Sequence, residues 1–331
     1  LYSWKSRSLV QRDDRIKASM ELIRAEQRVL PRARGSVISI GNYDGVHAGH
    51  RELIRVLKDQ ARVFSAPATV MTFEPYPQKY FRPDDPPTRL TTFREKLELL
   101  QDSGVDRVIC LRFNQDLAET KADEFIERCL VERLDIRHLV VGENFRFGRG
   151  RKGSVELLRE LALAHGFGVT GVNTVRIDGE RVSSSRIREL LRNGNLNRAR
   201  ALLGRRFSIS GHVAYGDQRG RTWGFPTANI YPRYDHVPLR GVFAVLVTGV
   251  GGRVLNGIAN LGHRPTVSGD KFLLEVHCFD FDQNIYGQRI QVEFCRWIRN
   301  ERKFNGPEAL QTQIRKDVDQ ARHWFRDHFA E

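Results

Sequence analysis

The sequence predicts an α/β domain built on a parallel sheet, followed by a small antiparallel β-barrel that ends in a long helix. Two patterns and one number lead to this prediction. In the first half, strand-like segments alternate with helical segments of about 10 to 15 residues. The second half consists of short strands separated by glycine-rich turns, which is typical of small barrels. The length of 331 residues corresponds to two domains of roughly 150 residues each.

The first half contains the elements of the parallel sheet. Apolar, strand-like segments are expected at residues 36–40, 68–73, 107–111, 138–141 and 168–172. Helical spacing of apolar side chains is found between these strands, at residues 50–64, 92–103, 122–134 and 154–166. Because strands that are joined by helices pair in parallel, we expect helices on both faces of one sheet.

The pattern changes near residue 184. Two arginine-rich helices are expected at residues 184–193 and 196–203, followed by strands at 207–214, 241–250, 253–259, 271–279 and 290–298. Pro307 begins a final helix that extends to about residue 329. We therefore expect an N-terminal extension without order (1–19), an α/β domain (20–183), a helical linker (184–205) and a barrel domain (206–331).

Composition excludes several classes of protein. The 54 basic and 40 acidic side chains leave a net charge of +14, which suits a nucleic-acid binder, a protein that binds anionic membranes or an enzyme of phosphorylated substrates. No apolar run approaches the roughly 18 residues that span a bilayer, and the first residues lack the positive stretch followed by an apolar run that is typical of a signal peptide. We expect a cytoplasmic protein without a membrane partner. The four cysteines are far apart, so neither a zinc site nor a disulfide framework is indicated.

The segment 41–50 reads G-N-Y-D-G-V-H-A-G-H and lies directly after the first expected strand. His47 and His50 are three residues apart where a helix begins, so both face the same side. The free N–H groups and the dipole of a helix N-terminus favour anions, and imidazoles can donate hydrogen bonds to phosphate oxygens. The sequence therefore predicts a phosphate site. Its candidate residues are Gly41, Asp44, Gly45, His47, Gly49 and His50.

A second cluster of polar residues begins the helix expected at 184–193. Ser184 and Ser185 can cap this helix, and Arg188 lies one turn later on the same side. Hydroxyls, a helix N-terminus and a guanidinium group suit a polyphosphate.

The barrel region begins with glycines that can bring backbone N–H groups close to phosphates. Gly211, Gly216 and Gly220 are followed by Arg221, but the segment is not a Walker A loop because G-x-x-x-x-G-K-[ST] is absent. Next comes the segment Pro226-Thr227-Ala228-Asn229. On a strand, Thr227 and Asn229 point to the same face, and their oxygens are suitable ligands for Mg²⁺.

These motifs, in this order, resemble the bacterial bifunctional riboflavin kinase/FAD synthetases. The resemblance rests on 41–50, V-G-E-N-F-R-F-G at 141–148 and S-S-S-R-I-R at 183–188, then on P-T-A-N at 226–229 and L-E-V-H at 274–277. It implies an HxGH-type nucleotidyltransferase domain with a Rossmann-like parallel sheet, followed by a riboflavin kinase barrel.

The resemblance also implies substrates and residue roles. His47 and His50 would stabilise ATP during adenylyl transfer to FMN, with Asn144 in the nucleotide site. In the barrel, Glu275 would be the general base for phosphorylation of riboflavin, Pro226 would contact the nucleotide, and Thr227 and Asn229 would bind Mg²⁺. The implied partners are riboflavin, FMN and ATP. ATP with Mg²⁺ is a co-substrate, whereas FMN and FAD are products and not prosthetic groups.

Two alternatives stay open at this point. Tyr76 occupies a position where the family usually has histidine, which allows a riboflavin kinase with an impaired adenylyltransferase. The second alternative is a basic RNA-binding or regulatory protein on a nucleotidyltransferase fold, because residues 183–225 contain nine arginines and two acidic residues. Against it, no RNA-binding signature with interleaved aromatic residues is present, so no nucleic-acid partner is expected. The oligomeric state is not indicated.

One further segment matches the pattern of a dinucleotide-binding motif but not its usual context. Residues 148–153 fit G-x-G-x-x-G. They do not follow a strand directly, and the next strand does not end in an acidic residue, so a dinucleotide fingerprint is not indicated. A mobile basic loop over the nucleotide site and a solvated turn are both compatible with the segment.

Overall fold

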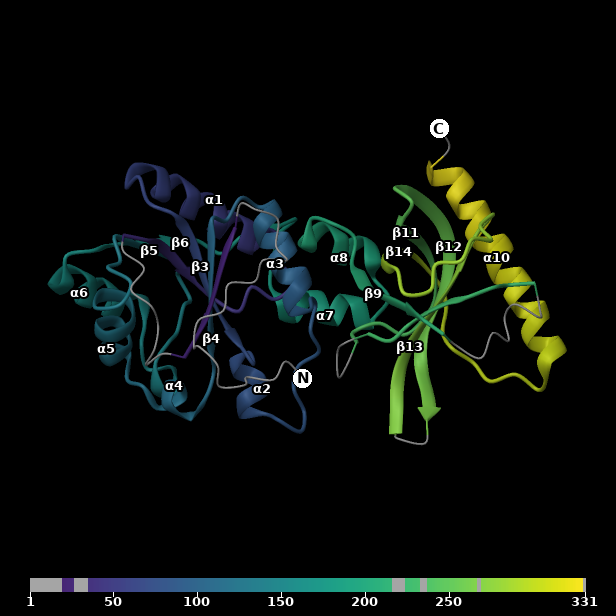
Figure 1. The fold of residues 1–331 in the computed structure, drawn as a ribbon, viewed down its shortest axis with the longest axis horizontal. Coiled ribbons are helices and arrows are strands. Elements are labelled where there is room, and N and C mark those ends of the chain that lie inside the picture. The colour runs from purple at the N-terminus through teal and green to yellow at the C-terminus, as the bar shows by residue number, and fades with distance from the viewer. Residues whose placement is uncertain (1–19, 27–34, 216–223, 233–236, 267–268, 330–331) are drawn as a thin grey trace. The chain divides into compact units, whose positions relative to one another are not determined.

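The computed structural model describes residues 20–26, 35–215, 224–232, 237–266 and 269–329. These residues form two compact units (Figure 1). The first unit comprises Leu1–Pro87 and Phe93–Ser183, and the second unit comprises Thr88–Thr92 and Ser184–Glu331. The extension expected at 1–19 lies outside the described residues.

The first unit is built on a parallel sheet of six strands in the order β1-β4-β3-β2-β5-β6. Every neighbouring pair in it is parallel, as predicted. The strands are β1 (Glu21–Ala25), β2 (Val37–Ile40), β3 (Ala68–Glu74), β4 (Arg107–Arg112), β5 (His138–Gly142) and β6 (Gly168–Val172). A small two-stranded sheet follows, made of β7 (Arg176–Ile177) and β8 (Glu180–Arg181).

Helices cover both faces of the sheet, because alternate residues of each strand enter different cores. Val37 packs in one core with Ile54 of α1, and Ile38 packs in the other with Leu158 of α6. The helices of this unit are α1 (Ala48–Val63), α2 (Pro77–Phe81), α3 (Phe93–Asp102), α4 (Gln115–Glu119), α5 (Ala122–Phe125) and α6 (Val155–His165), with a short 3-10 turn at Arg149–Arg151.

Two departures from the expected local structure concern β1 and the helix expected at 122–134. The edge strand β1 was not expected, because Glu21 and Arg24 interrupt its apolar pattern at the half-buried edge of the sheet. The helix expected at 122–134 ends its α-helical part at Phe125 and continues as a π-helix over Ile126–Val131. Propensity does not distinguish the two hydrogen-bond patterns, and π-turns are often found near functional sites.

The second unit contains a closed antiparallel barrel in the order β10-β13-β12-β11-β14-β9, as predicted. Its strands are β9 (Ser208–Ala214), β10 (Ala228–Ile230), β11 (Gly241–Val250), β12 (Arg253–Thr266), β13 (Gly269–Cys278) and β14 (Arg289–Arg299). Inside, the rings of Phe243 and Phe294 meet edge to face with centroids 5.1 Å apart. The strand β12 is longer than expected because it pairs with β13 as far as Thr266.

In the described part of the second unit, three helices accompany the barrel: α7 (Ser184–Arg192), α8 (Leu196–Leu203) and α10 (Pro307–Phe329). The helix α10 packs Val318, Ala321 and Phe325 against apolar side chains of the barrel wall, including Val242 and Ile258. The helices α7 and α8, which the sequence suggested as a linker, belong to the compact second unit. Among the described residues, no helix combines the length and apolarity that a membrane crossing requires.

Candidate functional site

The first candidate site is the turn between β2 and α1, and the sheet topology places it where α/β proteins bind ligands. The chain runs from β2 to β3 on one side of β2, and later returns to place β5 on its other side. Loops diverge at the carboxyl ends of two such strands and leave room for a ligand. The segment 41–47 follows β2, and Asn144 follows β5. Asn144 is exposed, and its side chain donates to the Thr174 hydroxyl over 3.1 Å.

The backbone of this turn is strained. Tyr43, Gly45 and Val46 have φ angles of 49°, 85° and 40°. Only glycine adopts this region without cost, and a β-branched residue there is unusual. Tyr43 and Val46 in this region each cost about 1 to 3 kcal/mol, so the surrounding structure must hold them. Strain of this kind gathers at functional sites, which fits the motif found in the sequence.

Tyr43 fixes the turn to the sheet. Its side chain is fully buried, and its hydroxyl donates to the Ser39 hydroxyl over 2.6 Å, which in turn donates to the carbonyl of Val140 on β5. Burial raises the pKa of Tyr43 despite the hydrogen bond to Ser39, so the phenol stays protonated. The chain Tyr43–Ser39–Val140 therefore joins the turn to both strands at the switch point.

His47 and His50 lie together at the start of α1. Their rings stack with centroids 3.7 Å apart and an interplanar angle of 13°. His47 is the N-cap, and its Nδ1 accepts a hydrogen bond from the backbone N–H of His50 over 3.3 Å. With a lone pair at Nδ1, a neutral His47 carries its proton on Nε2. An Nε2–H group at a helix N-terminus can donate a hydrogen bond to an anion.

His50 is uncharged at neutral pH. Burial lowers its pKa well below the usual value, and the charges of His47, Lys96 and Arg51 lower it further. Its Nδ1 is buried and has no hydrogen-bond partner among the described residues. An unpartnered buried nitrogen is unusual in a folded protein, and an oxygen of an anionic ligand would satisfy it through an N–H group.

Lys96 is a residue of this site that sequence reasoning missed. Its side chain on α3 is 4% exposed, and Nζ lies 3.4 Å from the Thr72 hydroxyl, which donates to the carbonyl of Asn42. Lysine is rarely buried unless it is paired. In the sequence, the only signal was a lysine among the inward-facing positions of the helix at 92–103. Lys96 brings a cation to the turn that holds the two histidines.

The other polar cluster of the first motif series starts α7, in the second unit. The helix begins at Ser184 as expected, with Ser185 exposed. The Arg188 side chain is half-buried, and its Nε donates to the carbonyl of Thr88. Arg188 is therefore positioned by the segment Thr88–Thr92, which belongs to the same unit.

Tyr76 uses its hydroxyl within the fold. The residue precedes α2, is 8% exposed, and donates to the carbonyl of Pro87 over 2.5 Å.

Close packing explains why glycine occupies positions 148 and 153. A Cβ at Gly148 would lie 2.7 Å from the Ala122 nitrogen, and one at Gly153 would lie 2.7 Å from the Phe147 ring. The G-x-G-x-x-G match thus forms a tight turn closed by hydrogen bonds between Phe147 and Gly153.

The second candidate site lies on the barrel, where three polar residues stand side by side on neighbouring strands. Asn229 of β10 is opposite Glu275 of β13, and Glu275 is opposite Asn260 of β12. Directly opposed residues share a face of the sheet. Glu275 is half-buried, and its carboxylate has no hydrogen bond or ion pair within the described part of the chain. A carboxylate in this state can accept a proton.

Asn229 has an orphaned acceptor. The residue is 6% exposed, and its Oδ1 has no hydrogen-bond partner among the described residues. Thr227, two residues earlier, is half-buried. Two neutral oxygen donors beside a carboxylate are a suitable set for a hard cation such as Mg²⁺.

The remaining predicted residues of the barrel differ in what the structure shows of them. Gly211 lies in β9, and a Cβ there would meet the Ile230 side chain at 2.4 Å, so close packing of β9 and β10 already requires glycine. Pro226 is exposed, and its carbonyl accepts a hydrogen bond from His277. Gly216, Gly220 and Arg221 lie outside the described residues.

Comparisons with known proteins match both halves of the chain. Residues 30–186 match the family model of FAD synthetase, and residues 203–325 match that of riboflavin kinase. The bifunctional riboflavin kinase/FMN adenylyltransferase of Escherichia coli K12 is 45% identical over 88% of this chain and 93% of its own length. The protein of that name from Haemophilus influenzae is 43% identical over 92% of this chain and 99% of its own length.

A solved structure has the same fold. A crystal structure from Streptococcus pneumoniae, described as a macrolide-efflux protein, has a TM-score of 0.79 and 30% sequence identity. The match covers 92% of this chain and 99% of that one. A shared fold alone does not require sequence identity of 45% over 88% of the chain together with a family model that matches each half. This chain belongs to the family of bifunctional riboflavin kinase/FMN adenylyltransferases.

Proposed function

We propose that this enzyme phosphorylates riboflavin to FMN and then adenylylates FMN to FAD, with ATP as the co-substrate of both reactions. The observation that carries the proposal is that two separate clusters suit two phosphate chemistries. The turn after β2 offers two stacked imidazoles at a helix N-terminus, and the barrel aligns Glu275 with Asn229. Both activities are those of the family.

Adenylyl transfer needs a site that stabilises developing charge. A phosphate oxygen of FMN attacks the α-phosphorus of ATP, the bond to the β-phosphate oxygen breaks, and pyrophosphate leaves. No covalent enzyme intermediate is needed. The Nε2–H of His47 and an N–H of His50 donate to phosphate oxygens, while the α1 N-terminus and Lys96 contribute positive potential. Catalysis here is positioning and charge stabilisation.

Phosphorylation of riboflavin needs a base. The 5′-hydroxyl attacks the γ-phosphorus of ATP, its proton passes to the Glu275 carboxylate, and ADP leaves. Thr227 and Asn229 would hold Mg²⁺ through their side-chain oxygens, and the orphaned Oδ1 of Asn229 fits this role. When bound, the metal neutralises charge on the phosphates. Glu275 lies opposite Asn229, so the base and the metal ligands face the same side.

The other assigned residues remain predictions of the family resemblance. Gly41, Asp44, Gly45, Gly49 and Asn144 would contact the nucleotide of adenylyl transfer, as would Ser184, Ser185 and Arg188. In the kinase, Gly211, Gly216, Gly220, Arg221 and Pro226 would do so. A cytoplasmic location and the expectation of no nucleic-acid partner also stay predictions.

The test measures FMN and FAD separately, by mass, from riboflavin, ATP and Mg²⁺. We expect both products. The His47→Ala variant should form FMN but lose FAD, because its donor to the triphosphate is gone. The Glu275→Ala variant should lose FMN formation but convert supplied FMN to FAD. Loss of both activities in either folded variant would contradict the assignment to two sites, and FMN without FAD from the unmodified enzyme would favour a kinase with an impaired adenylyltransferase.

A further inference from the structure

His277 links the catalytic strand β13 to the segment that carries the proposed metal ligands. Its Nδ1 lies 2.9 Å from the carbonyl oxygen of Pro226, the residue immediately before Thr227. A carbonyl oxygen only accepts, so Nδ1 is the donor in this hydrogen bond. His277 is two residues from Glu275 and shares its face of the sheet.

The backbone around Pro226 explains why a side chain is needed there. The strand β10 is three residues long, and its ladder with β13 begins at the pair Ala228 and Val276. Pro226 and Thr227 therefore precede the first residue pair of this ladder, and proline has no N–H group to donate. The imidazole of His277 gives the Pro226 carbonyl a hydrogen-bond donor outside that ladder.

The ring of His277 is fixed in place by aromatic neighbours. Phe225 meets it edge to face at 5.5 Å and 85°, and Phe279 at 5.9 Å and 66°. Phe279 is itself covered by Arg322 of α10, whose guanidinium carbon lies 4.5 Å above the ring. Arg322 makes two hydrogen bonds of 2.9 Å to Asp280. The orientation of the donor is thus set by packing and not by solvent.

We propose that His277 is a positioning residue of the kinase: it holds the Pro226 carbonyl so that Thr227 and Asn229 present their oxygens to the metal of MgATP opposite Glu275. This inference rests on the proposed kinase function. His277 does not touch substrate in this role. Its loss should weaken binding of the metal nucleotide more than it slows the chemical step.

Two variants separate the hydrogen bond from the packing. In His277→Asn, the amide nitrogen takes nearly the position of Nδ1 and can still donate, whereas His277→Leu cannot donate. A neutral hydrogen bond contributes about 0.5 to 1.5 kcal/mol, which corresponds to roughly 2- to 12-fold in binding. We expect His277→Leu to raise KM for MgATP and the Mg²⁺ requirement of FMN formation by that factor, with kcat changed less. His277→Asn should remain close to the unmodified enzyme.

A local readout that does not depend on turnover is hydrogen exchange, measured by mass spectrometry on a peptide that covers residues 224–230. Faster exchange there is expected in His277→Leu, together with weaker protection by MgADP, but not in His277→Asn. The matched control is His323→Leu, because His323 is an exposed histidine on α10. FAD formation from supplied FMN should be unchanged in all three variants.

Each outcome decides the matter. Unchanged Mg²⁺ dependence and exchange in His277→Leu would overturn the inference, and so would equal damage in the Asn and Leu variants, since the packing alone would then matter. If the Leu variant does not fold, His277→Gln replaces it. Its amide lies one methylene further out and should miss the Pro226 carbonyl, so Gln as good as Asn would also overturn the inference. If the unmodified enzyme forms no FMN at all, the proposed kinase function fails and the inference fails with it, whereas FMN formation that His277→Leu leaves unchanged would contradict the inference alone.

Discussion

At the scale of single residues, the proposed adenylyl-transfer site depends on close contacts around His47. A Cβ built on Gly49 would lie 3.3 Å from both Cε1 and Nδ1 of the His47 ring. Gly49 is the second residue of α1, so its backbone is helical and alanine could adopt it. Glycine at this position therefore makes room for the His47 imidazole, the proposed catalytic group, and is not needed by the turn.

The Gly49→Ala variant should lose activity without losing stability. The added methyl group displaces the His47 ring by a few tenths of an ångström, while alanine in a helix is favoured over glycine by about 1 kcal/mol. Since a misplacement of about 1 Å can cost 100-fold, we expect FAD formation to fall about tenfold with an unchanged or higher Tm. FMN formation by the same protein is the control. Unchanged FAD formation would show that the ring of His47 tolerates the shift.

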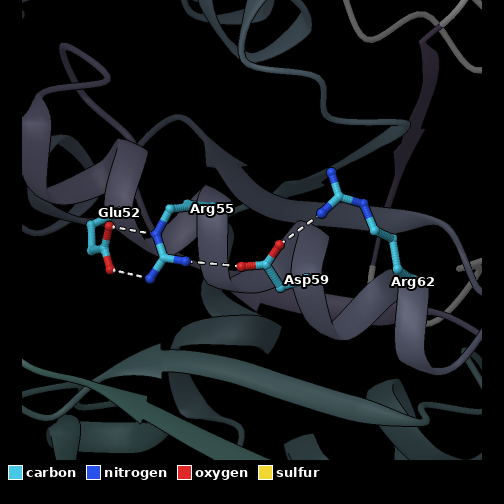
Figure 2. Close-up of polar contacts among 4 residues, drawn as sticks. All are labelled: Glu52, Arg55, Asp59 and Arg62. Carbon is cyan, nitrogen blue, oxygen red and sulfur yellow. Dashed lines mark hydrogen bonds and ion pairs between the residues drawn. The ribbon is translucent and has the colours of Figure 1, made fainter.

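At the scale of elements, the helix α1 shows which of its faces matters. Glu52, Arg55, Asp59 and Arg62 form a ladder of ion pairs along its exposed face, with N–O distances of 2.7 to 2.9 Å (Figure 2). Ion pairs between exposed side chains contribute little to stability. The opposite face, with Ile54, Leu57 and Ala61, packs on the sheet and holds the helix N-terminus at the site.

The attachment of α10 to the barrel is of a different kind. Arg299 at the end of β14 contacts Asp317 of α10 at 2.7 to 3.0 Å, and Asp317 also accepts from Gln313 over 2.7 Å. The Asp317 side chain is 4% exposed and the Arg299 side chain 19%. Removing one member of such a pair leaves a buried charge without compensation.

The Arg299→Ala variant should lower the free energy of unfolding of the second unit by about 3 kcal/mol, in the range of 3 to 5 kcal/mol found for broken buried pairs. This change is measured by urea unfolding in which hydrogen exchange in peptides of α10 is the signal. The matched control is Arg322→Ala, which removes an ion pair to Asp280, a side chain that is 78% exposed. Equal effects of the two substitutions would show that burial of the Arg299 pair does not determine its contribution.

At the scale of the whole molecule, three histidines make stability depend on pH. Burial lowers the pKa of His50 and His138 in the first unit, and burial is also the largest cause of the lowered pKa of His277 in the second. The hydrogen bond to Pro226 partly opposes the shift at His277. In the unfolded chain these groups titrate near pH 6.5. Between that pH and the lower folded pKa, the unfolded state binds more protons.

Stability is therefore complete above about pH 6.5 and falls as the pH decreases towards the folded pKa values. Each histidine contributes at most about 1.4 kcal/mol per pH unit in this window. Urea unfolding at pH 7.5, 6.5 and 5.5 measures the slope, and His138→Gln should reduce it for the first unit only. A free energy of unfolding that stays constant down to pH 5.5 would contradict the neutral state of these rings.

Much of the architecture could be predicted from the sequence, because it depends on local periodicity. The alternation of strands and helices predicts the parallel sheet, and the run of short strands with glycine turns predicts the barrel. The motifs at 41–50 and 226–229 are contiguous, so their residue types could be identified without coordinates. The strand β1 was not predicted, because Glu21 and Arg24 interrupt the apolar pattern of this five-residue strand at the edge of the sheet.

The sequence by itself determined which functional groups are present: histidines at a helix start, hydroxyl and amide oxygens two residues apart, and a carboxylate in a strand. Tertiary structure alone decided how these groups are held and charged. The alignment of Glu275 with Asn229, the donor from His277 to Pro226, the buried Lys96 and the neutral state of His50 all join residues that are distant in the chain. Strand register, burial and proximity set these properties, and none of them is encoded in a local run of residues.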